Sequence, residues 1–185
     1  GDEGVHDHGS ENFVLDWVGC LPGTRESRRL VGDYILTEND ILEHRQFEDA
    51  VCYGGWCVDI HTPNGLLDFD KLPSYPGFFE GVYTIPYRSY YSKNIRNMFM
   101  AGRNISVTHI ALGSTRVMRT CGLIGEVVGM AAAVCARREA FPRDVYTTYF
   151  EDLKELMRKG TGRTDVPYTQ FYHQVDRTGH QAEDR

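Results

Sequence analysis

The residues between 97 and 136 constrain the fold more than any other part of the chain. They begin with a short apolar run at 98–101, which predicts a strand and ends in Gly-Arg-Asn at 102–104. A polar loop follows, and then a helix rich in glycine and alanine, which we expect to open at residues 120–122. A strand that leads through small residues to a helix N-terminus is typical of sites for anionic or electron-rich groups.

Three glycines, Gly122, Gly125 and Gly129, lie three and four residues apart in this helix. A glycine in a helix interior costs about 1 kcal/mol relative to alanine, so three in one helix indicate close approach by another group. Two alternatives remain open. The small-residue face packs against another element, or the helix N-terminus approaches a cofactor, where unpaired N–H groups and the helix dipole stabilise negative charge.

The rest of the chain alternates strand-like and helix-like patterns. Thr37 and Asp40 predict a helix start, and the helix is expected to run to about Gln46. We expect strands at 13–20, 30–36, 47–60 (broken near Gly54 and Gly55) and 82–91, a surface loop at 62–81, and a helix from Pro142 to Gly160. The predicted fold class is therefore α/β, and α+β in detail.

Charge and composition exclude several classes of function. The formal charge is −6 without a Lys/Arg-rich run, so we expect no nucleic-acid partner. The most apolar run, 121–136, is shorter than the roughly 20 residues of a membrane span, so none is predicted. Five cysteines without a C-x-x-C pair favour free or buried thiols, and no metal site is predicted.

Three long stretches carry a resemblance to a known family: LPGTRESRRLVGDYILTENDI, FEDAVCYGGWCVDIH and YTIPYRSYYSKNIRNMFMAGRNISVTHIALGSTRVMRTCGLIGEVVGMAAA. The chain resembles the C-terminal portion of the FAD-dependent oxidoreductases, a family that includes heterodisulfide reductase-like flavoproteins. The resemblance implies the C-terminal part of a two-lobed FAD-binding fold, with FAD as cofactor. It also implies flavin contacts from six residues: Gly102, Arg103, Asn104, Thr120, Cys121 and Gly122.

One expected element is missing from the sequence. Such flavoproteins have an N-terminal strand–G-x-G-x-x-G–helix unit that holds the FAD pyrophosphate, and this chain contains no G-x-G-x-x-G. We therefore expect a C-terminal fragment, or one chain of a split protein, whose partner is the missing N-terminal FAD-binding portion. Alone it should bind FAD weakly and be inactive. The predicted domains are a polar lead-in (1–12), part of a substrate or cap domain (13–96), the C-terminal part of the FAD-binding domain (97–160) and a polar tail (161–185).

Four residues are candidates for catalysis. His109 and Arg116 lie in the predicted loop, where fumarate reductase-type flavoproteins place a histidine and an arginine that handle an anionic substrate; the alternative is that both only fix the loop. Arg25 and Arg28 either point into the site or belong to a solvated charged face. The expected reaction is oxidation of a small-molecule C–H bond by hydride transfer to flavin. The competing hypothesis is a cofactor-free, partner-binding module of flavoprotein ancestry.

Overall fold

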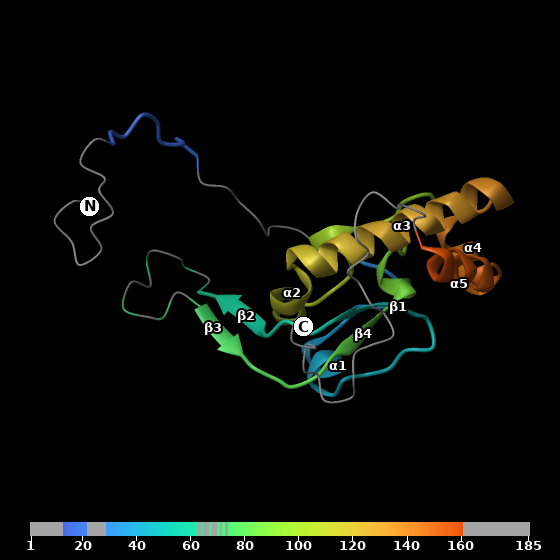
Figure 1. Cartoon of the computed structure of the whole chain (residues 1–185), viewed down its shortest axis with the longest axis horizontal. Helices are drawn as coiled ribbons and strands as arrows, with labels where there is room; N and C mark the ends of the chain where they lie inside the picture. Colours follow the sequence, from blue (N-terminus) through green and yellow to red (C-terminus); the bar gives the residue numbers. More distant parts are fainter. Residues whose placement is uncertain are drawn as a thin grey trace, which may run out of the picture.

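The fold mixes helices and short antiparallel strands, which confirms the predicted class (Figure 1). The computed structural model describes residues 13–21, 29–62, 64, 67, 70, 72 and 74–160. In chain order the elements are α1 (Glu38–Leu42), β1 (Ala50–Gly54), β2 (Val58–His61), β3 (Ser74–Gly77), β4 (Tyr83–Pro86), the 3₁₀ helices η2 (Tyr87–Ser89) and η3 (Gly102–Asn104), α2 (His109–Thr115), α3 (Met118–Arg138), α4 (Pro142–Thr147) and α5 (Phe150–Lys159).

The strands form two separate antiparallel ribbons, β1–β4 and β2–β3. The break between β1 and β2 falls where the sequence predicts it. Gly54 pairs with Tyr83, and a Cβ at Gly54 would overlap the Tyr83 side chain, so only glycine fits at the end of this strand. Beyond the break, β2 pairs with β3 instead, and this second ribbon extends away from the body of the molecule (Figure 1). Strand β2 of this ribbon lies against α2, and its Val58 still belongs to the main core.

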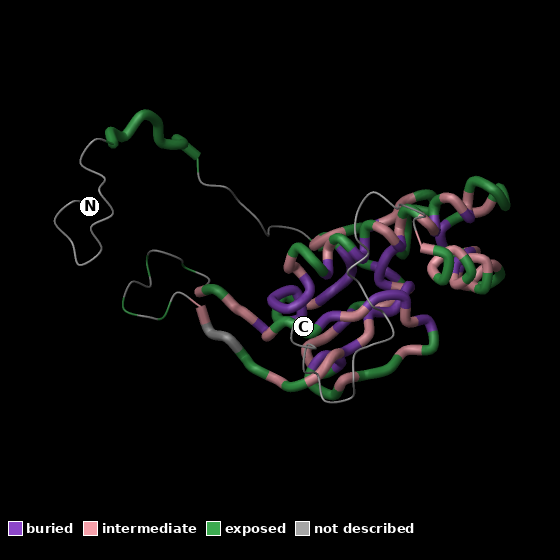
Figure 2. Tube along the Cα trace, viewed as in Figure 1, coloured by how far each residue is buried: buried purple, intermediate pink, exposed green. Residues whose placement is uncertain are grey.

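Helix α3 is the central core helix. It packs on β1, α4 and α5. Its buried apolar side chains are Leu123, Ile124, Val127, Ala131 and Val134. The sequence predicts no membrane span because the apolar run at 121–136 is short. Helix α3 extends beyond this run at both ends, and by length and composition alone it could cross a membrane. Its buried row instead lies in the same core as Leu36 and Ile85, as in the core helix of a globular fold (Figure 2). This core joins both sides of the predicted boundary at residue 96, and the division into domains stays a prediction.

A cluster of tyrosines fills the centre beside α3. Tyr83, Tyr87, Tyr90 and Tyr91 are almost wholly buried, and three of their hydroxyls have partners in Ser114, Pro142 and Asp33. The aromatic segment at 82–91 therefore packs in the core rather than lining a substrate site. Only its first half is a strand, because η2 begins directly after Pro86.

Several predicted strands do not form among the described residues. Residues 13–20 form no strand, and their apolar residues are exposed on a segment that lies away from the body (Figure 2). The runs at 30–36 and 98–101 each make a single bridge, Leu36 to Val107 and Phe99 to Tyr91. The run at 98–101 ends because Gly102 adopts a left-handed φ of 63° and starts η3.

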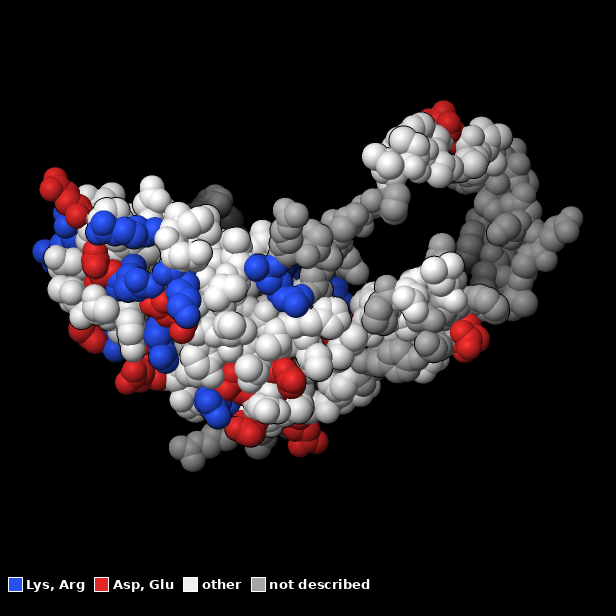
Figure 3. Space-filling view, turned by 180° about the vertical axis from the view of Figure 1, so that it is seen from behind, with Lys and Arg blue, Asp and Glu red and all other residues white. Residues whose placement is uncertain are grey.

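The helices match the predictions better at their starts than at their ends. Thr37 and Asp40 form the expected capping box of α1, although the helix ends at Leu42. Pro142 begins α4 as predicted, and Gly160 ends α5 with a φ of 66°, but Thr148 and Tyr149 separate two helices where one was expected. On the face seen in Figure 3, basic and acidic side chains are interspersed around these helices.

Candidate functional site

Two groups of residues adjoin Val117, the N-cap of α3, along the chain. The first, called the η3–α3 ledge, consists of η3 and the first turn of α3 (Met118, Arg119 and Thr120), and η3 packs against α3. Asn104 is exposed, and Gly102 and Arg103 are half-exposed. No atom of a described residue lies within 4 Å of a Cβ built on Gly102, so the ledge is open above this glycine.

The first turn of α3 has no side-chain cap. Its N-cap residue is Val117, and the N–H of Cys121 donates to the Val117 carbonyl at 2.9 Å, as the first bond of the helix. The helix thus starts two residues earlier than predicted. The expectation that Cys121 and Gly122 present unpaired N–H groups is wrong, because both lie inside the helix. The N–H groups that precede the first helical bond belong to Met118, Arg119 and the buried Thr120.

The three helix glycines face open space. Apart from the chain neighbours and the nearby backbone of α3 itself, no atom of a described residue lies within 4 Å of a Cβ built on Gly122, Gly125 or Gly129. In the described part of the chain, no other element packs against these glycines, as the packing alternative requires. Beside them, the Cys121 thiol donates to the Thr115 carbonyl at 3.6 Å, and burial raises its pKa although Arg103 opposes the shift. Cys121 thus joins α3 to the end of α2, which positions the second group.

The second group, called the Asp59 cluster, consists of Asp59, His61 and Arg116. Arg116 is the C-cap of α2, and its Nη2 donates to Asp59 Oδ2 at 2.9 Å. His61 Nε2 lies 3.3 Å from the same Oδ2. The other carboxylate oxygen, Oδ1, is buried and has no hydrogen-bond partner among the described residues. One carboxylate oxygen therefore holds an arginine and a histidine side by side.

A glycine in α2 makes this arrangement possible. A Cβ on Gly113 would lie 2.7 Å from the carbonyl oxygen of Asp59 and 3.1 Å from its nitrogen. Only a residue without a side chain lets α2 lie directly on the backbone of β2. Arg116, less than one turn further along the chain, then reaches the Asp59 carboxylate.

The structure separates the two catalytic candidates of the predicted loop. That loop contains α2, with His109 exposed at its first residue and Arg116 at its far end, about 10 Å apart along the helix axis. The structure does not bring these two side chains together. Arg25 and Arg28 lie outside the described residues, so nothing is said of their placement.

Sequence reasoning missed His61 and Asp59. A signal was present, because residues two apart in a strand lie on one face, and VDIH places an acid and a histidine in that relation. The neighbouring Cys57 is a poor nucleophile, since burial and the charge of Asp59 raise the pKa of its thiol. Among the residues that the structure describes, no group of three or more His, Cys, Asp or Glu side chains could hold a metal ion.

Comparison with known proteins decides the family. A model described as FAD dependent oxidoreductase matches residues 5–157. The chain belongs to this family. Neither a curated protein nor a solved structure matches it.

The ledge of this FAD dependent oxidoreductase fits the flavin end of FAD. The uncapped turn of α3 offers N–H donors and the positive end of a helix dipole, and Arg103 adds a cation beside them. At Gly102 and Gly122 no described side chain lies against the position of a Cβ, so the backbone is open to a ligand at both glycines. Gly102, Arg103, Asn104 and Thr120 are the ledge residues that would hold the ring, while Cys121 and Gly122 border it without donating backbone N–H groups.

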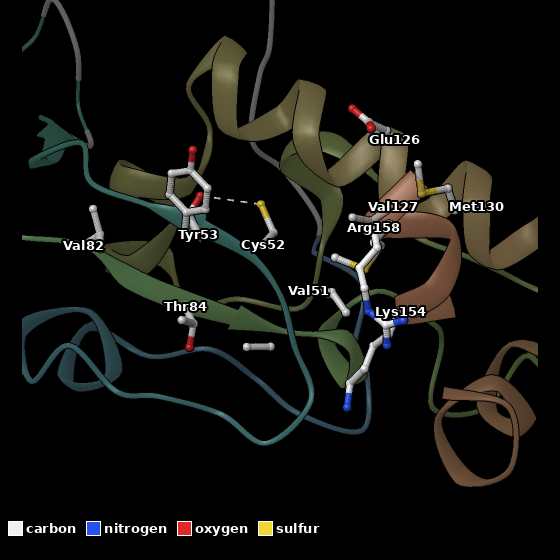
Figure 4. Close-up of a pocket in the computed structure, with 12 residues that line it drawn as sticks. Val51, Cys52, Tyr53, Val82, Thr84, Glu126, Val127, Met130, Lys154 and Arg158 are labelled. Atoms are coloured by element: carbon white, nitrogen blue, oxygen red, sulfur yellow. Dashed lines mark hydrogen bonds between the residues drawn. The ribbon is translucent and has the colours of Figure 1, made fainter. Parts of the chain in front are cut away.

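The protein also has a cavity of about 500 Å³, which is lined by residues of neither the ledge nor the Asp59 cluster (Figure 4). It lies between the β1–β4 ribbon and helices α3 and α5, and its walls include Val51, Val82, Val127, Met130 and Met157. Its rim cations, Lys154 and Arg158, both contact Glu151. Burial raises the pKa of the Cys52 thiol, which lines the cavity, to about 12, so this thiol is not a nucleophile. None of the predicted site residues lines this cavity.

Proposed function

We propose that this chain forms the flavin-ring side of an FAD-dependent oxidoreductase that oxidises a small organic substrate by hydride transfer. When bound, the flavin supplies the two-electron chemistry as hydride acceptor. The family match supports an oxidoreductase of the flavoprotein kind. We assign the chain to the C-terminal portion of such an enzyme, and the quoted stretches favour relatives of the heterodisulfide reductase type.

The observation that carries this proposal is the uncapped first turn of α3 beside two open glycines. A helix N-terminus stabilises a nearby negative charge by about 0.3–1 kcal/mol when exposed and up to about 2 kcal/mol when partly buried. A reduced flavin carries negative charge along one ring edge, so the ledge favours the reduced state. The glycines at 102 and 122 supply room that no described residue fills.

Arg116 is the residue that we assign to the substrate. Its Nη2 is held by Asp59, while Nε and Nη1 have no hydrogen-bond partner among the described residues. A guanidinium held at Nη2 still has N–H donors on Nη1 that can reach one oxygen of a substrate carboxylate. Because Val117, the next residue, is the N-cap of α3, Arg116 lies next to the ledge along the chain.

A second candidate function is favoured by one observation, the absence of G-x-G-x-x-G from the 185 residues. Without that turn, this chain offers no evident site for the FAD pyrophosphate. Either another segment or chain supplies it, as we propose, or the chain is a cofactor-free module that keeps the flavoprotein scaffold and binds a partner.

The visible absorption spectrum of the protein purified from its native source separates the two functions. An oxidised flavin spectrum that bleaches on reduction with dithionite supports the oxidoreductase. A colourless protein that stays colourless after incubation with FAD supports the partner-binding module. Isothermal titration of the 185-residue chain with FAD is expected to show weak or no binding. Tight binding would mean that the chain holds a phosphate site of its own.

A further inference from the structure

We propose that the cavity between the β1–β4 ribbon, α3 and α5 binds a small carboxylic acid with an unbranched apolar tail. No residue of the ledge or of the Asp59 cluster lines this cavity, so the inference goes beyond the proposed function. Its volume of about 500 Å³ lies in the range of about 300–1,000 Å³ that is usual for small-molecule sites. The walls of the cavity indicate the chemistry of the ligand.

Most of the cavity wall is apolar and comes from three elements. Val51 of β1 and Val127 of α3 are buried in the main core, and Met130 of α3 and Met157 of α5 are half-buried against it. Methionine side chains are flexible and polarisable, so two of them can follow the shape of an alkyl chain. Moving each methylene of such a chain from water to this wall is favourable. The wall therefore suits an apolar tail.

The α5 edge of the cavity carries two cations, which lie together in Figure 4. Lys154 and Arg158 are four residues apart on α5 and so share one face of the helix. Both contact Glu151, whose Oε1 lies 2.8 Å from Lys154 Nζ and whose Oε2 lies 3.6 Å from Arg158 Nη2. One carboxylate thus serves two cations, which leaves this edge with one positive charge. Because Glu151 is 75% exposed, its ion pairs are weak, and a ligand carboxylate can compete for the cations.

The acid that lines the cavity lies on another wall. Among the described residues of the lining, Glu126 on α3 is the only carboxylate, and Figure 4 shows it apart from the Lys154 amine. The α5 edge therefore attracts a ligand carboxylate, and Glu126 repels it. The site has a direction as a result. The carboxylate of the ligand lies at Lys154 and Arg158, and its tail lies along β1 against the apolar wall.

The first test locates the ligand through the methionine methyl groups. The chain has five methionines, of which Met130 and Met157 line the cavity. In carbon–proton spectra of the 185-residue chain labelled at these methyls, Met130→Leu and Met157→Leu assign the two signals. Octanoate should shift both signals and leave that of Met118, which is 91% exposed at the start of α3, unchanged. No shift at Met130 and Met157, or an equal shift at Met118, overturns the proposal.

The second test measures the tail and the charge of the ligand in the same titration. Each methylene added from pentanoate to octanoate should tighten binding by about fourfold, the value for a buried methylene. Octylamine, which has the same tail and the opposite charge, should bind at least about tenfold more weakly than octanoate. Affinity that is independent of tail length, or equal affinity for octylamine, overturns the assigned ligand class.

The third test removes the cations. The double variant Lys154→Met, Arg158→Met should weaken octanoate binding by about tenfold or more, the loss of a charge-assisted contact, and leave binding of the uncharged octanol unchanged. Lys159→Met is the matched control, because Lys159 lies on the same helix, pairs with Glu155 and does not line the cavity. An equal loss for octanol, or unchanged octanoate binding in the double variant, overturns the role of the α5 edge.

Discussion

Replacing Gly113 by alanine tests the geometry on which the Asp59 cluster depends. In the interior of α2, a Cβ at this position would lie 2.7 Å from the Asp59 carbonyl oxygen. The atoms it meets are backbone, so they cannot rotate away as a side chain would. To reach an ordinary contact of about 3.5 Å, α2 must move from β2 by roughly 0.8 Å. That movement draws Arg116 away from Asp59.

The magnitude follows from two opposing effects. Overpacking costs about 1–3 kcal/mol, while alanine gains about 1 kcal/mol over glycine in a helix interior. Gly125→Ala is the matched control, because its Cβ meets no described atom within 4 Å and it gains the same helix propensity. The propensity gain cancels between the two variants, so Gly113→Ala should be about 1–3 kcal/mol less stable than Gly125→Ala.

Urea denaturation of both variants, followed by circular dichroism of the helices, measures this difference directly. Equal midpoints with equal slopes would refute the reasoning, because α2 would then not lie on the Asp59 backbone. A Gly113→Ala protein more stable than Gly125→Ala would refute it more strongly.

Three further outcomes follow from single contacts. Arg88→Met should cost about 3–5 kcal/mol in urea denaturation, because it strands the buried Asp49 carboxylate that Arg88 binds through Nε at 2.9 Å, whereas Arg138→Met at an exposed pair should leave the urea midpoint nearly unchanged. Cys52, with a thiol pKa of about 12, should resist alkylation by iodoacetamide at pH 8 while the exposed Cys20 reacts, as read by peptide mass spectrometry; equal labelling would place Cys52 at the surface. Arg116→Ala and Arg116→Lys should keep FAD in the protein from its native source and slow flavin reduction by the substrate about 10- to 100-fold in rapid-mixing absorbance; a wild-type rate would leave Arg116 a purely structural role.

The predictions that succeeded rest on local chemistry. Thr37 and Asp40 cap α1 through contacts three residues apart, and Gly54 ends β1 because no side chain fits there. The ledge residues form two short runs, 102–104 and 118–120, within one stretch of the sequence, so a pattern over 97–136 was enough to point to both runs. Their contacts with a flavin stay a prediction.

The predictions that failed required knowledge of partners distant in the chain. The run at 13–20 has strand-like residues but no pairing partner among those described. The sequence predicts a loop where α2 forms, because seven residues are too few to show a helical period, although Thr108 does provide an N-cap. The Asp59 cluster joins β2 to the end of α2, more than fifty residues later, through a glycine whose role appears only in three dimensions.

Gly122→Val tests the central claim, that the ledge seats the flavin of this family member. The matched control is Gly129→Val, which lies on the same face of α3 about 10 Å further from the ledge and carries the same helix-propensity change. The measurement is flavin content per polypeptide, from the visible spectrum of each variant expressed in full length in the native source. Loss of flavin from Gly122→Val, with full occupancy in Gly129→Val and equal folding of both, is the predicted result. Full flavin occupancy in Gly122→Val would contradict the account and leave α3 as a packing helix alone.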